Sequence, residues 1–265
     1  MNKNDTIETR RHHMGIRASR TISNTIIYIV LILMSVIWLI PFICILLQSF
    51  RVESTWQVGY VAPRQWGFDN YVALFQTDFK RWYLNTFIMA LFNAVFQTVI
   101  VLCMSYTLSR FRFRMRAALM KFMLVLILFP GMLTMIILYR VLKDLGLTQA
   151  HAVPGLILVY IASSGMGYYV SKGFFDTIPK SLDEAARIDG AGHFRTFWQI
   201  ILPIARPIIT FLGITSFTAP WMDFIFPKMV LRSVEKQTLA LGLFSFVSDK
   251  KNEFTVFAAG SRVSR

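Results

Sequence analysis

The chain has 265 residues, of which 55% are hydrophobic and only 16% are charged, and its mean hydropathy is +0.53. This composition excludes an ordinary soluble domain and favours an all-α membrane protein. The formal net charge is +14, but arginines gather beside apolar blocks, as in SRFRFRMRAA at residues 109–118. Basic residues flank membrane helices in this way, so we expect no nucleic-acid binding.

Long apolar blocks follow one another along the chain. A helix needs about 20 apolar residues to cross about 30 Å of hydrocarbon, so blocks near this length predict transmembrane helices. Five complete helices are predicted, at residues 25–47, 86–108, 122–139, 152–171 and 207–222. We therefore divide the chain into an N-terminal arm, residues 1–24, and a transmembrane domain, residues 25–265.

The first block is interpreted as a retained helix. Residues 25–47 are too long for the core of a signal peptide, and no small-residue cleavage site follows them. Lysines and arginines in the arm and within residues 110–116 place the N-terminus in the cytoplasm. Residues 52–83 are then external, and residues 172–203 are cytoplasmic.

Two glycine-containing segments are expected to interrupt their helices. They are FPG at residues 129–131 and GMGYY at residues 165–169. A membrane tolerates freed backbone groups only where neighbouring helices or a water-filled path satisfy them. Both segments are compatible with a translocation route and equally with ordinary kinks.

The C-terminal apolar run is short. It begins at Phe254 and meets Arg262 and Arg265 before half a bilayer is covered. We therefore expect an incomplete sixth helix.

A polar loop, residues 176–203, lies between the fourth and fifth blocks. Ser181 followed by Glu184 has the spacing of a capping box, which predicts that a helix begins there. Ala185 and Ala186 would keep one side of that helix shallow enough for another surface to approach. Gly190, with Gly192, permits a turn before a second helix at residues 194–203. From this pattern alone, a docking site and an interfacial connector without a partner are both open.

A fixed spacing runs through this loop: E-A-A, three residues, G, nine residues, then I-x-L-P. It is filled by Glu184, Ala185, Ala186, Gly190, Ile200, Leu202 and Pro203. The pattern resembles the EAA loop in permease subunits of binding-protein-dependent ABC importers, which have the type I (MetI-like) architecture. Neighbouring segments such as GYYVSKGFFDTIPKSLDEAARIDGAG and TLALGLFSF resemble the carbohydrate branch, most closely the G-type permease of maltose and maltodextrin systems.

The resemblance implies a division of labour between chains. In the family, the first helix of the loop docks in a cleft of a cytoplasmic ATPase, and the seven motif residues inherit that role here. The implied partners are a homologous second permease, an ATP-binding-cassette ATPase dimer, an extracellular sugar-binding protein and the lipid bilayer of a bacterial inner membrane. The chain lacks a G-x-x-x-x-G-K-[ST] loop, so its energy must come from another polypeptide.

The family continues through a final helix, whereas this sequence ends in SRVSR. We therefore expect the last span to be missing and the docking loop to be intact.

Three alternatives are weighed against a sugar importer. An ion-driven secondary transporter normally needs ionisable residues inside its spans, and Asp223 is the only acidic candidate. An intramembrane enzyme needs a nucleophile with a base or a metal cluster, but His12, His13, His151 and His193 show no H-E-x-x-H spacing. An ABC importer of a non-sugar solute is the third. We predict no catalytic, metal or cofactor site, and we note His193 as a possible ATPase contact.

Polar side chains inside the blocks are candidates for a sugar path. They are Asn93, Gln97, Tyr106, Trp221 and Asp223. Hydrogen bonds between helices are the alternative role, and for any single residue we favour it.

Overall fold

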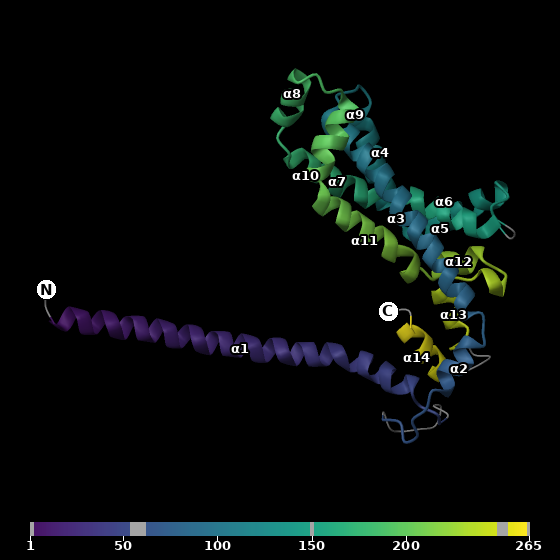
Figure 1. The fold of residues 1–265 in the computed structure, drawn as a ribbon, viewed down its shortest axis with the longest axis horizontal. Helices are drawn as coiled ribbons and strands as arrows, with labels where there is room; N and C mark the ends of the chain where they lie inside the picture. Colours follow the sequence, from purple (N-terminus) through teal and green to yellow (C-terminus); the bar gives the residue numbers. More distant parts are fainter. Residues whose placement is uncertain (1–2, 54–61, 149–150, 248–253, 264–265) are drawn as a thin grey trace. The chain divides into compact units, whose positions relative to one another are not determined.

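A computed structural model describes residues 3–53, 62–148, 151–247 and 254–263 (Figure 1). Within these ranges the regular structure is helical, and an isolated bridge joins Arg51 to Trp66. The described residues form two compact units. One lies within residues 1–73 and 253–265, and the other within residues 74–252.

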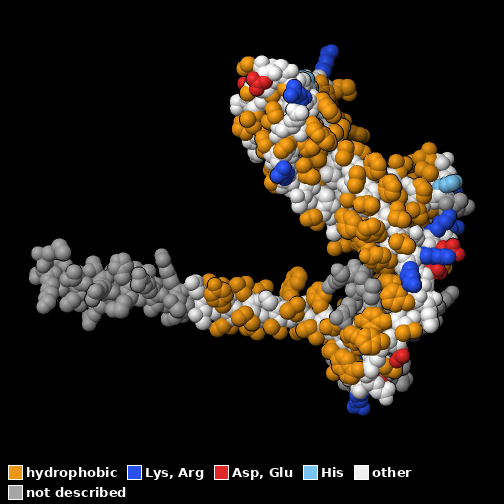
Figure 2. Space-filling view, in the orientation of Figure 1, with side chains coloured by type: hydrophobic (Ala, Val, Ile, Leu, Met, Phe, Trp, Pro, Cys, Tyr) orange, Lys and Arg blue, Asp and Glu red, His pale blue; other side chains and the backbone are white. Residues whose placement is uncertain are grey.

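The first unit is built around α1 (Lys3–Ser49), which contains the first predicted span. Most apolar side chains between Ile26 and Ile43 are exposed, as the orange surface in Figure 2 shows. At the end of α1, the amide of Asn70 in α2 (Asp69–Phe75) donates to the carbonyls of Ser49 and Arg51, at 3.2 and 2.7 Å. The third helix, α14 (Phe254–Val263), has 10 residues and packs on α1. These 10 residues are fewer than the about 20 that cross a bilayer.

The second unit is organised by α3 (Phe79–Arg110), a 32-residue helix that contains the second predicted span. It packs against several other helices, and polar side chains along it hydrogen-bond to them. They include α6 (Ala152–Ala162), α7 (Gly165–Thr177), α11 (Arg206–Met222) and α13 (Leu239–Phe244). Removing α3 would therefore remove the common packing surface of the unit.

The third predicted span is not one straight helix. It is divided into α4 (Arg116–Leu128) and α5 (Gly131–Asp144), which meet at an angle of 104°. Phe129 adopts an extended conformation, φ −66° and ψ 138°, because the ring of Pro130 disfavours a helical residue before it. Proline also lacks the N–H that would continue the helix. The predicted break at FPG is confirmed, and the single span at 122–139 is corrected to a bent pair.

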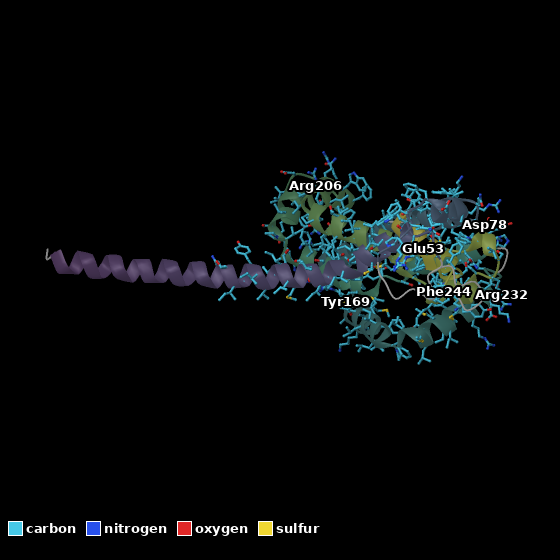
Figure 3. The ribbon with its side chains drawn as sticks, turned by 90° about the horizontal axis from the view of Figure 1, so that it is seen from below. Glu53, Asp78, Tyr169, Arg206, Arg232 and Phe244 are labelled. Carbon is cyan, nitrogen blue, oxygen red and sulfur yellow. The ribbon has the colours of Figure 1, made fainter. Side chains whose placement is uncertain are left out.

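The fourth and fifth predicted spans differ in their continuity. Helices α6 and α7 are interrupted at Ser163 and Ser164, just before GMGYY, yet together they remain one candidate span. Tyr169 of α7, labelled in Figure 3, donates a hydrogen bond to the carbonyl of Met120 in α4. The helical segment before α11 meets α11 at 81°. The described residues thus hold three unbent candidate spans, or five when each bent pair is counted.

The remaining short elements complete the second unit. They are α8 (Ser181–Ile188), α9 (His193–Thr196), the π-helical η3 (Phe197–Ile201), α10 (Leu202–Ile204), α12 (Ile225–Val230) and the 3₁₀-helical η4 (Val234–Lys236).

Candidate functional site

The polar loop folds as a short helix followed by a tight turn. Helix α8 occupies Ser181–Ile188 at one end of the α3–α11 bundle (Figure 1). Gly190 follows it with φ +78°, a left-handed conformation that glycine adopts at no steric cost. The N–H of Gly190 donates to the carbonyl of Arg187 at 3.0 Å, and the N–H of Ala191 to that of Ala186 at 2.8 Å. These two bonds form a Schellman motif, which fixes the direction in which the chain leaves α8.

The predicted capping box is wrong, although the predicted start of the helix is right. The N-cap is Lys180, whose side chain makes no cap hydrogen bond, and Ser181 is already the first helical residue. The Glu184 N–H donates instead to the carbonyl of Lys180 at 3.1 Å. Pro179 lies just before this N-cap and keeps Ile178 extended, which separates α7 from α8.

The outward side of α8 differs from the side that the alanine spacing predicts. Ala186 is 3% exposed and faces the interior of its own unit, so its placement on a shared outward surface is corrected. Glu184 and Ala185 are exposed, as predicted for a docking surface. Ile188 is 87% exposed and was not singled out from the sequence. Its signal was available, because Ile188 lies four residues after Glu184 and therefore shares its side of the helix.

The I-x-L-P end of the motif joins the loop to the bundle. Ile200 and Leu202 are half-buried against a core cluster that includes Phe175, Ile201 and Ile208. Pro203, in α10, is exposed. The motif therefore combines an exposed helix with an apolar anchor, and its residues do not all lie on one surface.

Two residues of α3 contact the start of α8. The Arg110 Nε atom lies 3.0 Å from Asp183 Oδ2, and these side chains are 6% and 15% exposed. The hydroxyl of Tyr106 donates to Asp183 Oδ1 at 3.3 Å. Tyr106, predicted as a path residue, is therefore placed beside the loop. The ring of His193 packs against that of Phe111 at a tilt of 55°, with centroids 4.7 Å apart, and His193 is exposed.

The path candidates Asn93 and Gln97 join helices. The Asn93 amide donates to the carbonyl of Ser216 in α11 at 2.7 Å, and the Gln97 amide donates to that of Tyr160 in α6 at 2.9 Å. Asn93 is 1% exposed and Gln97 is 7% exposed. These contacts match the role between helices that the sequence favoured for any single residue.

Three further polar side chains of α3 also donate hydrogen bonds to other segments of the chain. Trp82, Asn85 and Ser105 donate to backbone carbonyls of Val234, Glu235, Gln237 and Tyr168.

Trp221 and Asp223 lie at the opposite end of α11 from the loop. The Trp221 ring packs against Tyr83 and Phe217, with centroids 5.3 and 6.0 Å away. Asp223 follows the last residue of α11 and accepts a hydrogen bond from the Tyr160 hydroxyl at 2.9 Å. The Phe226 N–H donates to its other oxygen at 3.3 Å. Asp223 therefore has structural partners at a helix end.

An apolar cavity of about 850 Å³ lies among α4, α5, α6 and α7. Its lining includes Leu126, Ile137 and Leu158, and its polar side chains are those of Thr134, Ser163 and Tyr168. Such a lining supplies few of the hydrogen-bonding groups that orient a carbohydrate. We therefore do not assign this cavity to the sugar.

Replacing Asn93 by alanine tests its structural role. The expected result is a loss of about 0.6–1.7 kcal/mol of stability, because a hydrogen bond between membrane helices contributes about this much. Thermal unfolding of the detergent-solubilised protein measures this loss. The Michaelis constant for uptake should stay within twofold of the unchanged protein, and a large increase with unchanged stability would instead assign Asn93 to the path.

The comparisons with known proteins all match transport proteins. The family described as "binding-protein-dependent transport system inner membrane component" matches residues 101–260. The maltodextrin transport system permease protein MalD of Streptococcus pneumoniae is 34% identical, over 93% of this chain and 89% of that protein. The corresponding MdxG protein of Bacillus subtilis is also 34% identical, over 94% and 90%. A bacterial ABC transporter involved in alginate import has a similar fold, with a TM-score of 0.78, 22% identity and coverage of 93% and 92%.

Proposed function

Because the chain belongs to the family of binding-protein-dependent transport system inner membrane components, we propose that it forms half of the translocation path of an ABC sugar importer. It is a multi-pass membrane permease. The proposed cargo is a maltodextrin or a related oligosaccharide, and the observation that carries this is the 34% identity to two maltodextrin permeases over most of the chain.

The outward side of α8 is the proposed ATPase-docking surface. Glu184, Ala185 and Ile188 are exposed there, and together they offer one charge beside a small and a large apolar side chain. A well-oriented helix with an apolar anchor suits a groove on a partner protein. Ile200, Leu202 and Pro203 would join this surface to the membrane helices.

The proposed assembly contains the chain, a homologous second permease, two copies of the ATPase and an extracellular sugar-binding protein. The loop at 176–203 and the N-terminus lie in the cytoplasm in this proposal. The arginines at 110–116 support that orientation, because they lie at the same end of α3 as the loop.

Uptake into proteoliposomes tests the energy source. The complex is reconstituted with its sugar-binding protein, loaded with ATP, and supplied with labelled maltotriose while all ion gradients are collapsed. Accumulation of sugar is expected under these conditions. The proposal would be overturned if accumulation required a proton or sodium gradient and did not depend on ATP.

Reversing the charge of Glu184 tests the docking surface. Glu184→Lys is expected to weaken ATPase association at least about tenfold, because the few residues that dominate an interface each contribute about 2 kcal/mol or more. The measurement is the amount of ATPase that co-purifies with the tagged permease. Glu235→Lys is the matched control, since the Glu235 side chain is exposed in η4 and forms a surface ion pair with Arg81. Equal ATPase recovery from both variants would contradict the assignment.

A further inference from the structure

The last residue of α3 makes a buried ion pair with the first turn of α8. Arg110 Nε and Asp183 Oδ2 are 3.0 Å apart, and both side chains are largely shielded from solvent. From the sequence, Arg110 is one of four similar arginines in residues 109–118. In the structure it is shielded, whereas Arg112, two residues later, is exposed.

Other bonds converge on the same position. The hydroxyl of Tyr106 donates to Asp183 Oδ1 at 3.3 Å, and Arg110 Nη2 donates to the carbonyl of Ile178 at 3.0 Å. Ser109 donates to Asp176, at the end of α7, at 2.6 Å. The end of α3 thus holds the chain on both sides of the start of α8, at Asp176 and Ile178 before it and at Asp183 within its first turn.

The ion pair is incompletely hydrogen-bonded. Arg110 Nη1 is buried and has no hydrogen-bond partner among the described residues. Arg110 Nε and Asp183 Oδ2 are within ion-pair distance, but they lack the alignment of a hydrogen bond. A buried pair with unsatisfied groups is weak support for overall stability, because desolvation offsets much of its attraction. What the pair does is join α3 to α8, and so hold the two helices in a fixed relative position.

We propose that Arg110 and Asp183 are positioning residues that transmit displacement of α8 to α3. The inference rests on the proposed function, in which the ATPase moves α8. If α8 moved alone, each charge would be left buried without its partner, which is strongly unfavourable. Movement of α3 with α8 avoids this separation. Because α6, α7 and α11 all pack on α3, the displacement then reaches the helices of the unit.

The test separates transmission from folding by removing both charges together. The double variant Arg110→Gln with Asp183→Asn has no buried charge left unpaired, whereas each single variant retains one. All are assembled with the second permease, the ATPase and the sugar-binding protein. Thermal stability, ATPase co-purification, and sugar transported per ATP hydrolysed are measured on the same preparations.

The double variant is expected to recover stability and ATPase co-purification relative to the single variants. Its sugar transported per ATP should nevertheless fall about tenfold, within the range of typical coupling between distant sites. Arg112→Gln is the matched control and should keep the ratio of the unchanged protein. The inference would be overturned if the double variant transported as much sugar per ATP as the unchanged protein. That result would mean that the pair matters only for folding, since two neutral side chains would then replace it fully. Failure of the proposed function would appear differently, as absence of ATPase from the unchanged complex.

Discussion

Replacing Gly190 by valine is expected to reduce ATP-driven uptake at least about tenfold, while the same change at Gly192 leaves uptake near normal. The positive φ of 78° at Gly190 is the cause, since a left-handed conformation costs an L-residue about 1–2 kcal/mol, and more when it is β-branched. The eight-residue α8 is too short to be stable alone. Loss of the Schellman motif would therefore disorient the docking surface.

Gly192 is the matched control because it lies two residues away in the same loop and differs from Gly190 in backbone conformation. A Cβ added at either position meets no atom within 4 Å, so both positions are equally open at that atom. Gly192 has φ −72° and ψ 165°, an extended conformation that valine adopts readily. Gly190→Asn should lie between the two, because asparagine tolerates the left-handed region better than valine. Equal uptake by Gly190→Val and Gly192→Val, normalised to the amount of complex, would refute this account.

Replacing Gly242 by alanine is expected to cause the largest loss of stability. Its new methyl group would meet the ring of Trp82, which is 3% exposed. That ring is held in place, because its indole N–H donates to the Val234 carbonyl at 2.8 Å and it packs 6.0 Å from Phe246. Overpacking of this kind costs about 1–3 kcal/mol. A melting temperature lower by roughly 2–12 °C follows for a chain of this size.

The control for Gly242→Ala is the same substitution at Gly173. This glycine lies in α7, and a methyl group there would meet no atom within 4 Å. Alanine should be neutral or stabilise the helix by up to about 1 kcal/mol, because it favours helical backbone more than glycine does. Differential scanning fluorimetry of both purified variants measures the difference. Similar melting temperatures would show that the Trp82 ring can move aside.

Local sequence preferences predict the turn after α8 correctly, but they do not predict which residue is the N-cap of α8. Gly190 after a helical segment predicts a left-handed turn, because few other residues accept that conformation. Ser181 and Glu184 fit a capping box, but the helix has Lys180 as its N-cap, without a side-chain cap hydrogen bond. The spacing of two residue types does not show which residue becomes the N-cap.

Contacts between helices lie beyond what composition and spacing can predict. Hydropathy identifies residues 122–139 as apolar, but the 104° angle depends on how Pro130 redirects the chain. Likewise, Ala186 is as small as Ala185, and only packing decides which of them is buried. Arg110 looks like its neighbours until the fold brings Asp183 beside it.

The hydrogen bonds that polar side chains of α3 donate have an evolutionary consequence. Trp82, Asn85, Asn93, Gln97 and Ser105 all donate to main-chain carbonyls. Every residue type carries such a carbonyl, so the accepting position can mutate without losing its oxygen. We therefore expect these contacts to leave little correlated substitution in related sequences. Tyr106 with Asp183 and Ser109 with Asp176 join side chain to side chain, so changes at these pairs should be correlated.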